Sequence, residues 1–110
     1  MSANANDIPW LAPWGPIIGG EPDDSTAKEL YSELCESHPL FGIPARPIGC
    51  RQDCDDFLFE LLDGTKRLAR VHLTFAQHPE PDPRWPQTSI FTERDQFLQT
   101  MRADAEDWDA

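Results

Sequence analysis

The clearest pattern in the chain is an alternation of apolar and polar side chains over residues 56–62 and again over residues 67–75. The apolar positions of the two stretches are Phe57, Phe59, Leu61, Ala69, Val71, Leu73 and Phe75. Successive side chains of a strand point to opposite faces of its sheet, so this alternation predicts two β-strands with one buried face. A third strand, short and poorly patterned, is expected at residues 48–52.

The Asp63-Gly64 pair between the two patterned strands indicates a β-hairpin. A two-residue turn would set apolar positions beside polar ones. A three-residue loop over residues 62–64, with Gly64 in the left-handed conformation, keeps the apolar positions together. We therefore expect Phe57 to lie opposite Ala69, because a one-residue slip would turn every side chain to the wrong face.

Two helices are predicted, one before and one after the strands. Residues 24–26 offer N-caps for the first, with Thr26 and Glu29 in the spacing of a capping box. Apolar side chains then follow at helical spacing, and the residue before Pro39 is unfavourable for a helix, which ends it there. The second helix begins near Thr92.

Prolines shape the remaining segments. Residues 1–24 contain four prolines and three glycines together with Trp10 and Trp14. Prolines are unfavourable inside helices and central strands, so we expect an extended arm that places both tryptophans against the domain or against a partner. Residues 77–87 contain four more prolines and are expected to run extended.

These elements predict a single α+β domain in the order α-β-β-β-α. Its three-stranded, mainly antiparallel sheet would have both helices packed on one face. The domain would span residues 25–103, between a Pro/Gly/Trp-rich arm at 1–24 and an acidic tail at 104–110. A chain of 110 residues has room for one such domain.

Charge and hydropathy exclude several classes of protein. The formal net charge of −11 argues against a nucleic-acid partner, and much of the excess acid lies at the two ends, as is typical of solubilising tails. No apolar run is long enough for a membrane helix. No basic residue precedes Lys28, so a secretory signal is not expected. These features predict a cytoplasmic protein without a membrane partner.

Cysteine chemistry is not favoured. The three cysteines are odd in number, which argues against a disulfide framework. Cys50 and Cys54 could join His72 or His78 around zinc, but structural zinc sites usually have two close ligand pairs. The aspartates around Cys54 disfavour its thiolate and hence nucleophilic catalysis. We therefore expect no metal and no cofactor.

The candidate binding residues are Arg51, Asp53, Asp55, Asp56, Arg70, His72, Arg84 and Trp85. Glu60, Arg70 and His72 are expected on the second sheet face, where they could bind an anion or move a proton. Alternatively, this is the hydrated face of a half-buried sheet. The aspartates at 53–56 could hold a cation, but the EF-hand pattern is missing and a turn explains them better.

Four segments resemble a group of small bacterial proteins of unknown function. They are residues 38–42 (HPLFG), 51–59 (RQDCDDFLF), 71–75 (VHLTF) and 82–86 (DPRWP). The resemblance covers residues 28–102, with Phe41 and Phe75 where the similar proteins carry Tyr and Trp. It implies no catalytic residue, but it suggests that the polar segments belong to one unit.

The sequence favours a non-enzymatic binding or accessory protein that acts on a protein partner through its proline- and tryptophan-rich segments. Arg84 and Trp85 are of the residue types that most often anchor interfaces. The alternative is a small enzyme or ligand-binding domain that uses Asp53, Arg70 and His72, and an acidic inhibitor of a basic nuclease or DNA-binding protein is a weaker one. A pocket would favour a ligand, and a flat apolar patch with exposed tryptophans would favour a partner. The pocket residues would be Arg51, Asp53, Arg70, His72 and Trp85.

Overall fold

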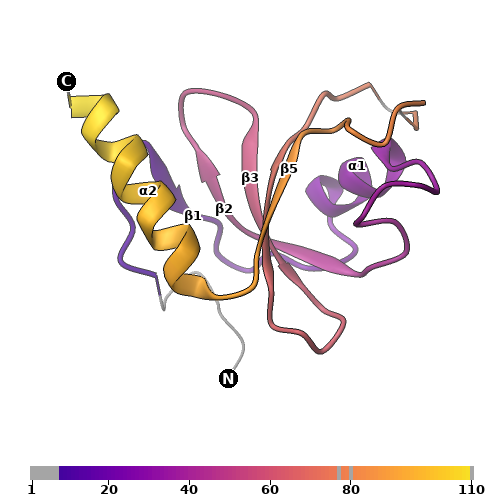
Figure 1. Cartoon of the computed structure of the whole chain (residues 1–110), viewed down its shortest axis with the longest axis horizontal. Coiled ribbons are helices and arrows are strands. Elements are labelled where there is room, and N and C mark those ends of the chain that lie inside the picture. The colour runs from indigo at the N-terminus through magenta and orange to yellow at the C-terminus, as the bar shows by residue number, and fades with distance from the viewer. Residues whose placement is uncertain (1–7, 77, 80, 110) are drawn as a thin grey trace.

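The computed structural model describes residues 8–76, 78–79 and 81–109 (Figure 1). Residues 1–7 of the expected arm, 77 and 80 of the proline segment and 110 of the expected tail lie outside the described residues. The elements are β1 (Trp14–Pro16), α1 (Ser25–Glu33), β2 (Ala45–Arg51), β3 (Asp56–Leu61), β4 (Leu68–His72), β5 (Thr88–Phe91) and α2 (Arg94–Asp109).

The sheet has five antiparallel strands in the order β1-β2-β3-β4-β5, so the expected three-stranded sheet is wrong while the α+β class is correct. The element order is β-α-β-β-β-β-α. β1 comes from the proline-rich arm and has three residues, and β5 has four. Strands this short show too little alternation to be recognised in a sequence.

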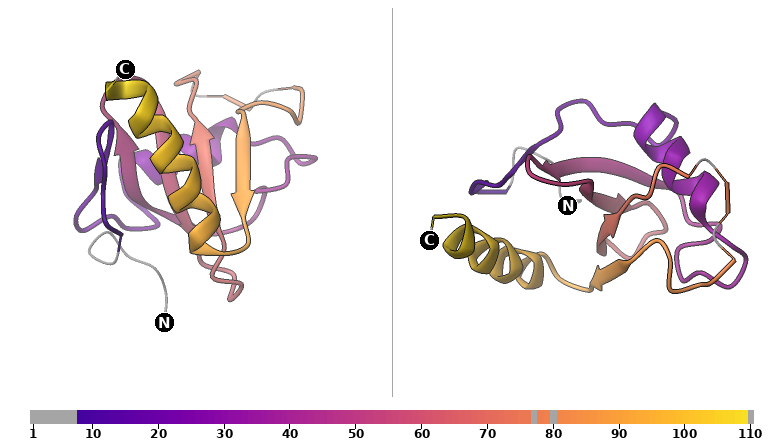
Figure 2. Two further views of the ribbon diagram at one scale, coloured as in Figure 1. Left: turned by 60° about the vertical axis from the view of Figure 1, so that its left-hand side comes forward. Right: turned by 90° about the horizontal axis from the view of Figure 1, so that it is seen from above.

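The two helices lie on opposite faces of the sheet, which corrects the expectation that both pack on one face (Figure 2). On the α1 face the buried core is Leu30, Leu34, Leu40, Ala45, Phe59, Leu61, Ala69, Val71 and Leu73. On the α2 face it is Ile8, Trp14, Ile48, Leu58, Leu68, Phe97, Leu98 and Met101. Leu58 and Phe59, adjacent in β3, are both 0% exposed, so each face has its own core.

The hairpin of β3 and β4 keeps the expected faces but not the expected pairs. Phe57 lies opposite Val71, two residues away from the predicted Ala69. The connection is longer than three residues because the strands end at Leu61 and begin again at Leu68. Gly64 has the expected left-handed conformation, with φ of 85°. A two-residue shift preserves the side-chain period, so the apolar positions still share one face.

The arm is tied to the sheet through β2. A Cβ atom on Gly49 would lie 2.2 Å from the ring of Trp10, so only glycine leaves room for this side chain. The register of β2 shifts between Pro47 and Gly49, and a bulge of this kind accommodates a proline that has no N–H to donate. Trp14 is buried against Phe97 of α2, with their rings 5.2 Å apart at 88°. The tryptophans of the arm therefore belong to the domain.

The helix ends differ from the expected ones by a few residues. Asp24 caps α1 by accepting a hydrogen bond from the Ala27 N–H at 2.9 Å, and the helix ends at Glu33, before Pro39 is reached. The last helix begins at Arg94 and continues through residues 104–109. Within the part of the chain that the structure describes, no helix is long and apolar enough to cross a membrane.

Candidate functional site

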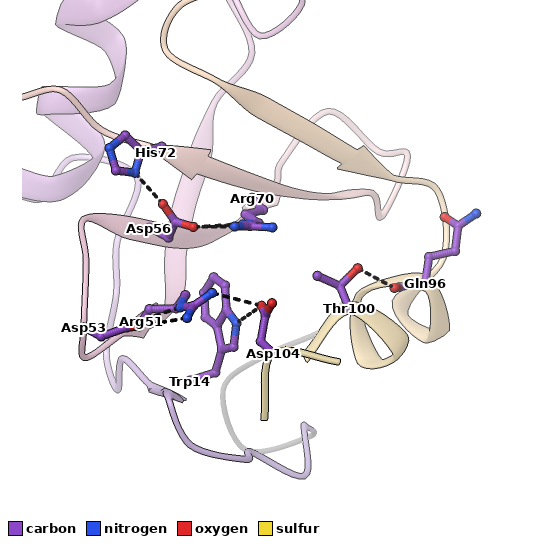
Figure 3. Close-up of polar contacts among 9 residues, drawn as sticks. All are labelled: Trp14, Arg51, Asp53, Asp56, Arg70, His72, Gln96, Thr100 and Asp104. Carbon is purple, nitrogen blue, oxygen red and sulfur yellow. Dashed lines mark hydrogen bonds and ion pairs between the residues drawn. The ribbon is translucent and has the colours of Figure 1, made fainter. Parts of the chain in front are cut away.

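The α2 face of the sheet divides into a covered half and an open half. The covered half, formed by Ile48, Leu58 and Leu68, packs under α2. The open half, formed by Asp56, Arg70 and His72, continues the same face of β3 and β4 beyond the helix (Figure 3). A hollow of about 670 Å³ lies over the open half. It is lined by Arg51, Cys54, Asp56, Arg70, His72, Arg84, Gln87, Thr88 and Ser89.

Asp56 is the buried centre of the open half and lies between His72 and Arg70 (Figure 3). Its Oδ1 is 2.6 Å from His72 Nδ1. Its Oδ2 accepts hydrogen bonds from Arg70 Nε at 2.9 Å and Arg70 Nη2 at 2.7 Å. Asp56 and His72 are cross-strand partners at the ends of β3 and β4, so the hairpin register itself brings this group together.

The electrostatics of this group keep Asp56 ionised. Burial acts to raise the pKa of its carboxyl, but the hydrogen bonds from His72 and Arg70 outweigh burial and hold the pKa below its ordinary value. A carboxylate that accepts from Nδ1 fixes the orientation of the His72 ring. The second ring nitrogen, Nε2, then lies on the side away from Asp56, and 45% of the His72 side chain is exposed (Figure 3).

Arg51 lines the hollow and connects it to α2. Its guanidinium donates to both carboxylate oxygens of Asp53, at 2.9 and 2.8 Å, and its Nη1 is 3.3 Å from Asp104 of α2. Asp104 also accepts from the indole N–H of Trp14 at 2.9 Å. The side chain of Asp53 raises the pKa of Arg51 further above its ordinary value, so this cation is permanent. Helix, arm and hollow are therefore linked by one polar cluster.

Of the other predicted residues, Arg84 lines the hollow but Asp53, Asp55 and Trp85 do not. Arg84 is paired with Asp82 at 2.6 Å, and 84% of the Arg84 side chain is exposed. Trp85 is 40% exposed beside it. The backbone carbonyl of Asp55 accepts a hydrogen bond from the Leu73 N–H at 3.0 Å, so the contact of this residue is a main-chain one. Asp53 acts on the hollow indirectly, by holding Arg51 and through the effect of its charge on Cys54.

Glu60 does not join Arg70 and His72. It is buried, its Oε1 accepts from Arg46 Nε at 2.8 Å, and it does not line the hollow. Asp56, at the other end of β3, takes the acidic position that the sequence reading gave to Glu60. Sequence reasoning also missed Gln87, Thr88 and Ser89, which reach the hollow because β5 pairs with β4. Once β5 is known, the pairing of Arg70 with Ser89 shows that the start of this strand lies beside the open half.

One wall of the hollow is formed by Gln87 and the first residues of β5, and hydrogen bonds of His38 act as a clamp on this wall. The buried His38 accepts from the Leu40 N–H through Nδ1 at 3.0 Å. Its Nε2 lies 3.2 Å from the carbonyl of Pro86 and 3.3 Å from Thr88 Oγ1. Burial lowers the pKa of His38 below its ordinary value, although the bond to Pro86 opposes this effect. The neutral ring can donate through Nε2 while accepting through Nδ1, so it joins the loop before β2 to the start of β5.

Cys54 contributes a thiol to the lining of the hollow. Burial, together with the charges of Asp56 and Asp53, raises the pKa of its thiol. Cys54 is therefore a weak nucleophile near neutral pH. Among the described residues, no group of three His, Cys, Asp or Glu side chains is arranged to hold a metal ion.

The hollow thus combines three arginines, a serine, a threonine and a histidine oriented by a buried carboxylate. Arginine donors suit carboxylate and phosphate oxygens, and an oriented imidazole can exchange a proton with a bound group. Comparisons with known protein families, with curated proteins and with solved structures found no significant match.

Proposed function

We propose that this protein binds a small anionic ligand in the hollow of the open half. The observation that carries the proposal is that Arg51, Arg70 and Arg84 line one hollow in a chain with only nine basic residues and a net charge of −11. Guanidinium groups are preferred partners of carboxylate and phosphate, and the aspartates that contact Nε and Nη2 of these three arginines hold the groups in fixed positions. The burial of Trp14 in the core also removes part of the flat tryptophan patch on which a partner-binding arm would depend.

The aspartates around the hollow determine how strongly it binds an anion. Asp53, Asp82 and Asp104 each pair with an arginine but do not themselves line the hollow. Together with Asp56 they offset the whole positive charge of the three arginines while fixing the positions of the donors. A preorganised but nearly neutral site favours a singly charged ligand, and it binds through directed hydrogen bonds more than through long-range attraction. The affinity should therefore be modest and should fall as salt concentration rises.

Isothermal titration with inorganic phosphate and with acetate tests the proposal. The wild-type protein should give saturable binding that weakens with added sodium chloride. Arg84→Ala should weaken it about fivefold or more, because a charged hydrogen-bond donor is lost. Arg84 is almost fully exposed, so this substitution should leave the fold intact.

Arg67→Ala is the matched control. Arg67 is also paired with an aspartate, Asp63 at 3.1 Å, but lies in the β3–β4 connection and does not line the hollow. The Arg67→Ala variant should bind phosphate with the affinity of the wild type. Equal losses in the Arg84 and Arg67 variants, or no saturable binding of either anion, would contradict the proposal.

A protein partner is the second candidate function. Arg84, which lines the hollow, and its neighbour Trp85 are both exposed, in a segment stiffened by prolines. In an affinity capture from cells, Trp85→Ala should lose a partner that docks here while binding phosphate normally. If Trp85→Ala instead unfolds the protein, Trp85 supports the core and the partner hypothesis fails.

A further inference from the structure

The Asp56–His72 pair has the arrangement of a general base. The hydrogen-bond network assigns the ring proton of neutral His72 to Nδ1, since the carboxylate of Asp56 can only accept, and Nδ1 is 2.6 Å from it. The lone pair of the neutral ring then lies on Nε2. His72 lines the hollow and its side chain is 45% exposed, so a water molecule can reach this nitrogen.

Cations lie in the same hollow as this base. Arg70 is two residues from His72 on the same face of β4, and it shares Asp56 with His72. Arg84 reaches the hollow from the segment before β5. A negatively charged reaction centre held beside Nε2 would lie in the same hollow as these guanidinium groups, whose positive charge would stabilise the charge that grows on it during attack.

Charge balance indicates which ester such a site suits. The three arginines of the hollow are paired with four aspartates, Asp56 in its lining and Asp53, Asp82 and Asp104 outside it, so the site has no surplus positive charge and opposes a dianion more than a monoanion. In a phosphodiester the single charge and the atom to be attacked belong to the same group. The arginines that bind it would therefore also stabilise the transition state.

We propose that the hollow hydrolyses small phosphodiesters with His72 as the general base. This inference rests on the proposed anion-binding function. His72 Nε2 takes a proton from a water molecule whose oxygen bonds to phosphorus, and the bond from phosphorus to the leaving oxygen breaks. The leaving oxygen takes up a proton, which gives one phosphate monoester and one alcohol from one diester and one water. Asp56 is the positioning residue that holds the base.

Hydrolysis of bis(p-nitrophenyl) phosphate, followed by the absorbance of released p-nitrophenolate, is the direct test. The wild type should release p-nitrophenolate faster than buffer alone. His72→Gln should lower kcat about 100-fold or more, as expected for loss of a general base. Asp56→Asn should lower kcat more than it raises KM, which a purely structural role would not produce.

His78→Gln is the control for loss of an imidazole. His78 is exposed, contacts the carbonyl of Pro79 and does not line the hollow, so this variant should keep the wild-type rate. Titration of each variant with dimethyl phosphate measures binding without turnover. His72→Gln should retain the wild-type affinity within a few-fold, because the arginines remain.

The outcomes separate the two proposals. A wild type that hydrolyses the diester no faster than buffer, or a His72→Gln variant as active as the wild type, overturns the hydrolytic site. If dimethyl phosphate still binds in that case, anion binding stands and only the catalytic inference fails. If neither dimethyl phosphate nor inorganic phosphate binds, the proposed function itself is wrong.

Discussion

The covered and open halves of the α2 face share the strands β3 and β4 and yet have opposite chemistry. In β4, Leu68 is buried under α2, while Arg70 and His72 line the hollow at the next two positions on the same face. In β3, Leu58 and Asp56 show the same change from apolar to charged. The alternation of inward and outward side chains along the strands is the same in both halves. The part of this face that α2 leaves uncovered is the part that is open to a ligand.

The two halves also hold their side chains by different forces. The covered half is fixed by packing, with Phe97 of α2 in edge-to-face contact with Trp14. The open half is fixed by ion pairs and hydrogen bonds that converge on one buried carboxylate. The packed apolar side chains of the covered half stabilise the fold but carry no reactive group. Burial of Asp56 in the open half costs desolvation energy, and its ion pairs hold the polar side chains in fixed positions.

The largest expected effect lies in the covered half. Leu58→Ala should lower the free energy of unfolding by about 2–5 kcal/mol, close to the about 3–5 kcal/mol expected for Phe59→Ala, because both side chains are fully buried. Denaturant unfolding of both variants measures this. A loss below about 1 kcal/mol for Leu58→Ala, with Phe59→Ala severe, would mean that α2 does not cover this face.

Asp56→Asn should cost less, about 1–3 kcal/mol, since its partners Arg70 and His72 remain partly hydrated. The folded-state pKa of Asp56 is lowered. Its contribution is therefore present above the unfolded-state pKa of about 4 and is lost as pH falls through the folded value. Unfolding curves at several pH values should show wild type and variant converging in acid. A gap that stays constant below about pH 4 would contradict this assignment.

Asp104→Ala tests the junction between the halves. It removes the bonds of α2 to Trp14 and Arg51, and should lower the free energy of unfolding by about 1 kcal/mol. Thermal unfolding measures the change. Asp107→Ala, an exposed position on the same helix, serves as the control and should leave the melting temperature unchanged. A loss of the same size at both positions would indicate a general helix effect.

The smallest effect concerns the clamp on the wall of the hollow. The folded-state pKa of His38 is lowered, so its contribution to stability is complete above the unfolded-state pKa of about 6.5 and declines as pH falls through that value. Wild-type stability should therefore decrease slightly between about pH 7.5 and pH 5.5, and His38→Gln should show a weaker dependence. Parallel pH profiles for the two proteins would contradict this role.

Alternation in β3 and β4 was strong enough to predict both strands and the shared face of Phe57 and Val71. The three-residue β1 and the four-residue β5 were too short to predict among the prolines. Arg70 and His72 could be placed on one face by their spacing alone. The expected register sets Asp56 opposite Arg70, whereas the pairing of Asp56 with His72 could not be predicted, because the actual hairpin register differs by two residues from the expected one.

The assignment of Glu60 to the site illustrates the same limit. Glu60 and Asp56 lie on the same face of β3, and the alternation treats them alike. Only the tertiary structure shows that Glu60 is buried with Arg46, while Asp56 meets the open end of β4. The β2–β3 register, which sets Arg46 opposite Glu60, makes this distinction and cannot be inferred from the alternation within β3.

Mapping of backbone amide shifts by NMR during titration with inorganic phosphate tests the central claim most directly. The account predicts saturable shifts at residues that line the hollow, above all Arg70, His72 and Ser89, with Leu58 and Leu68 of the covered half unmoved. Shifts spread evenly over both halves, or no saturable shift at the hollow, would contradict the claim that the open half is a ligand site.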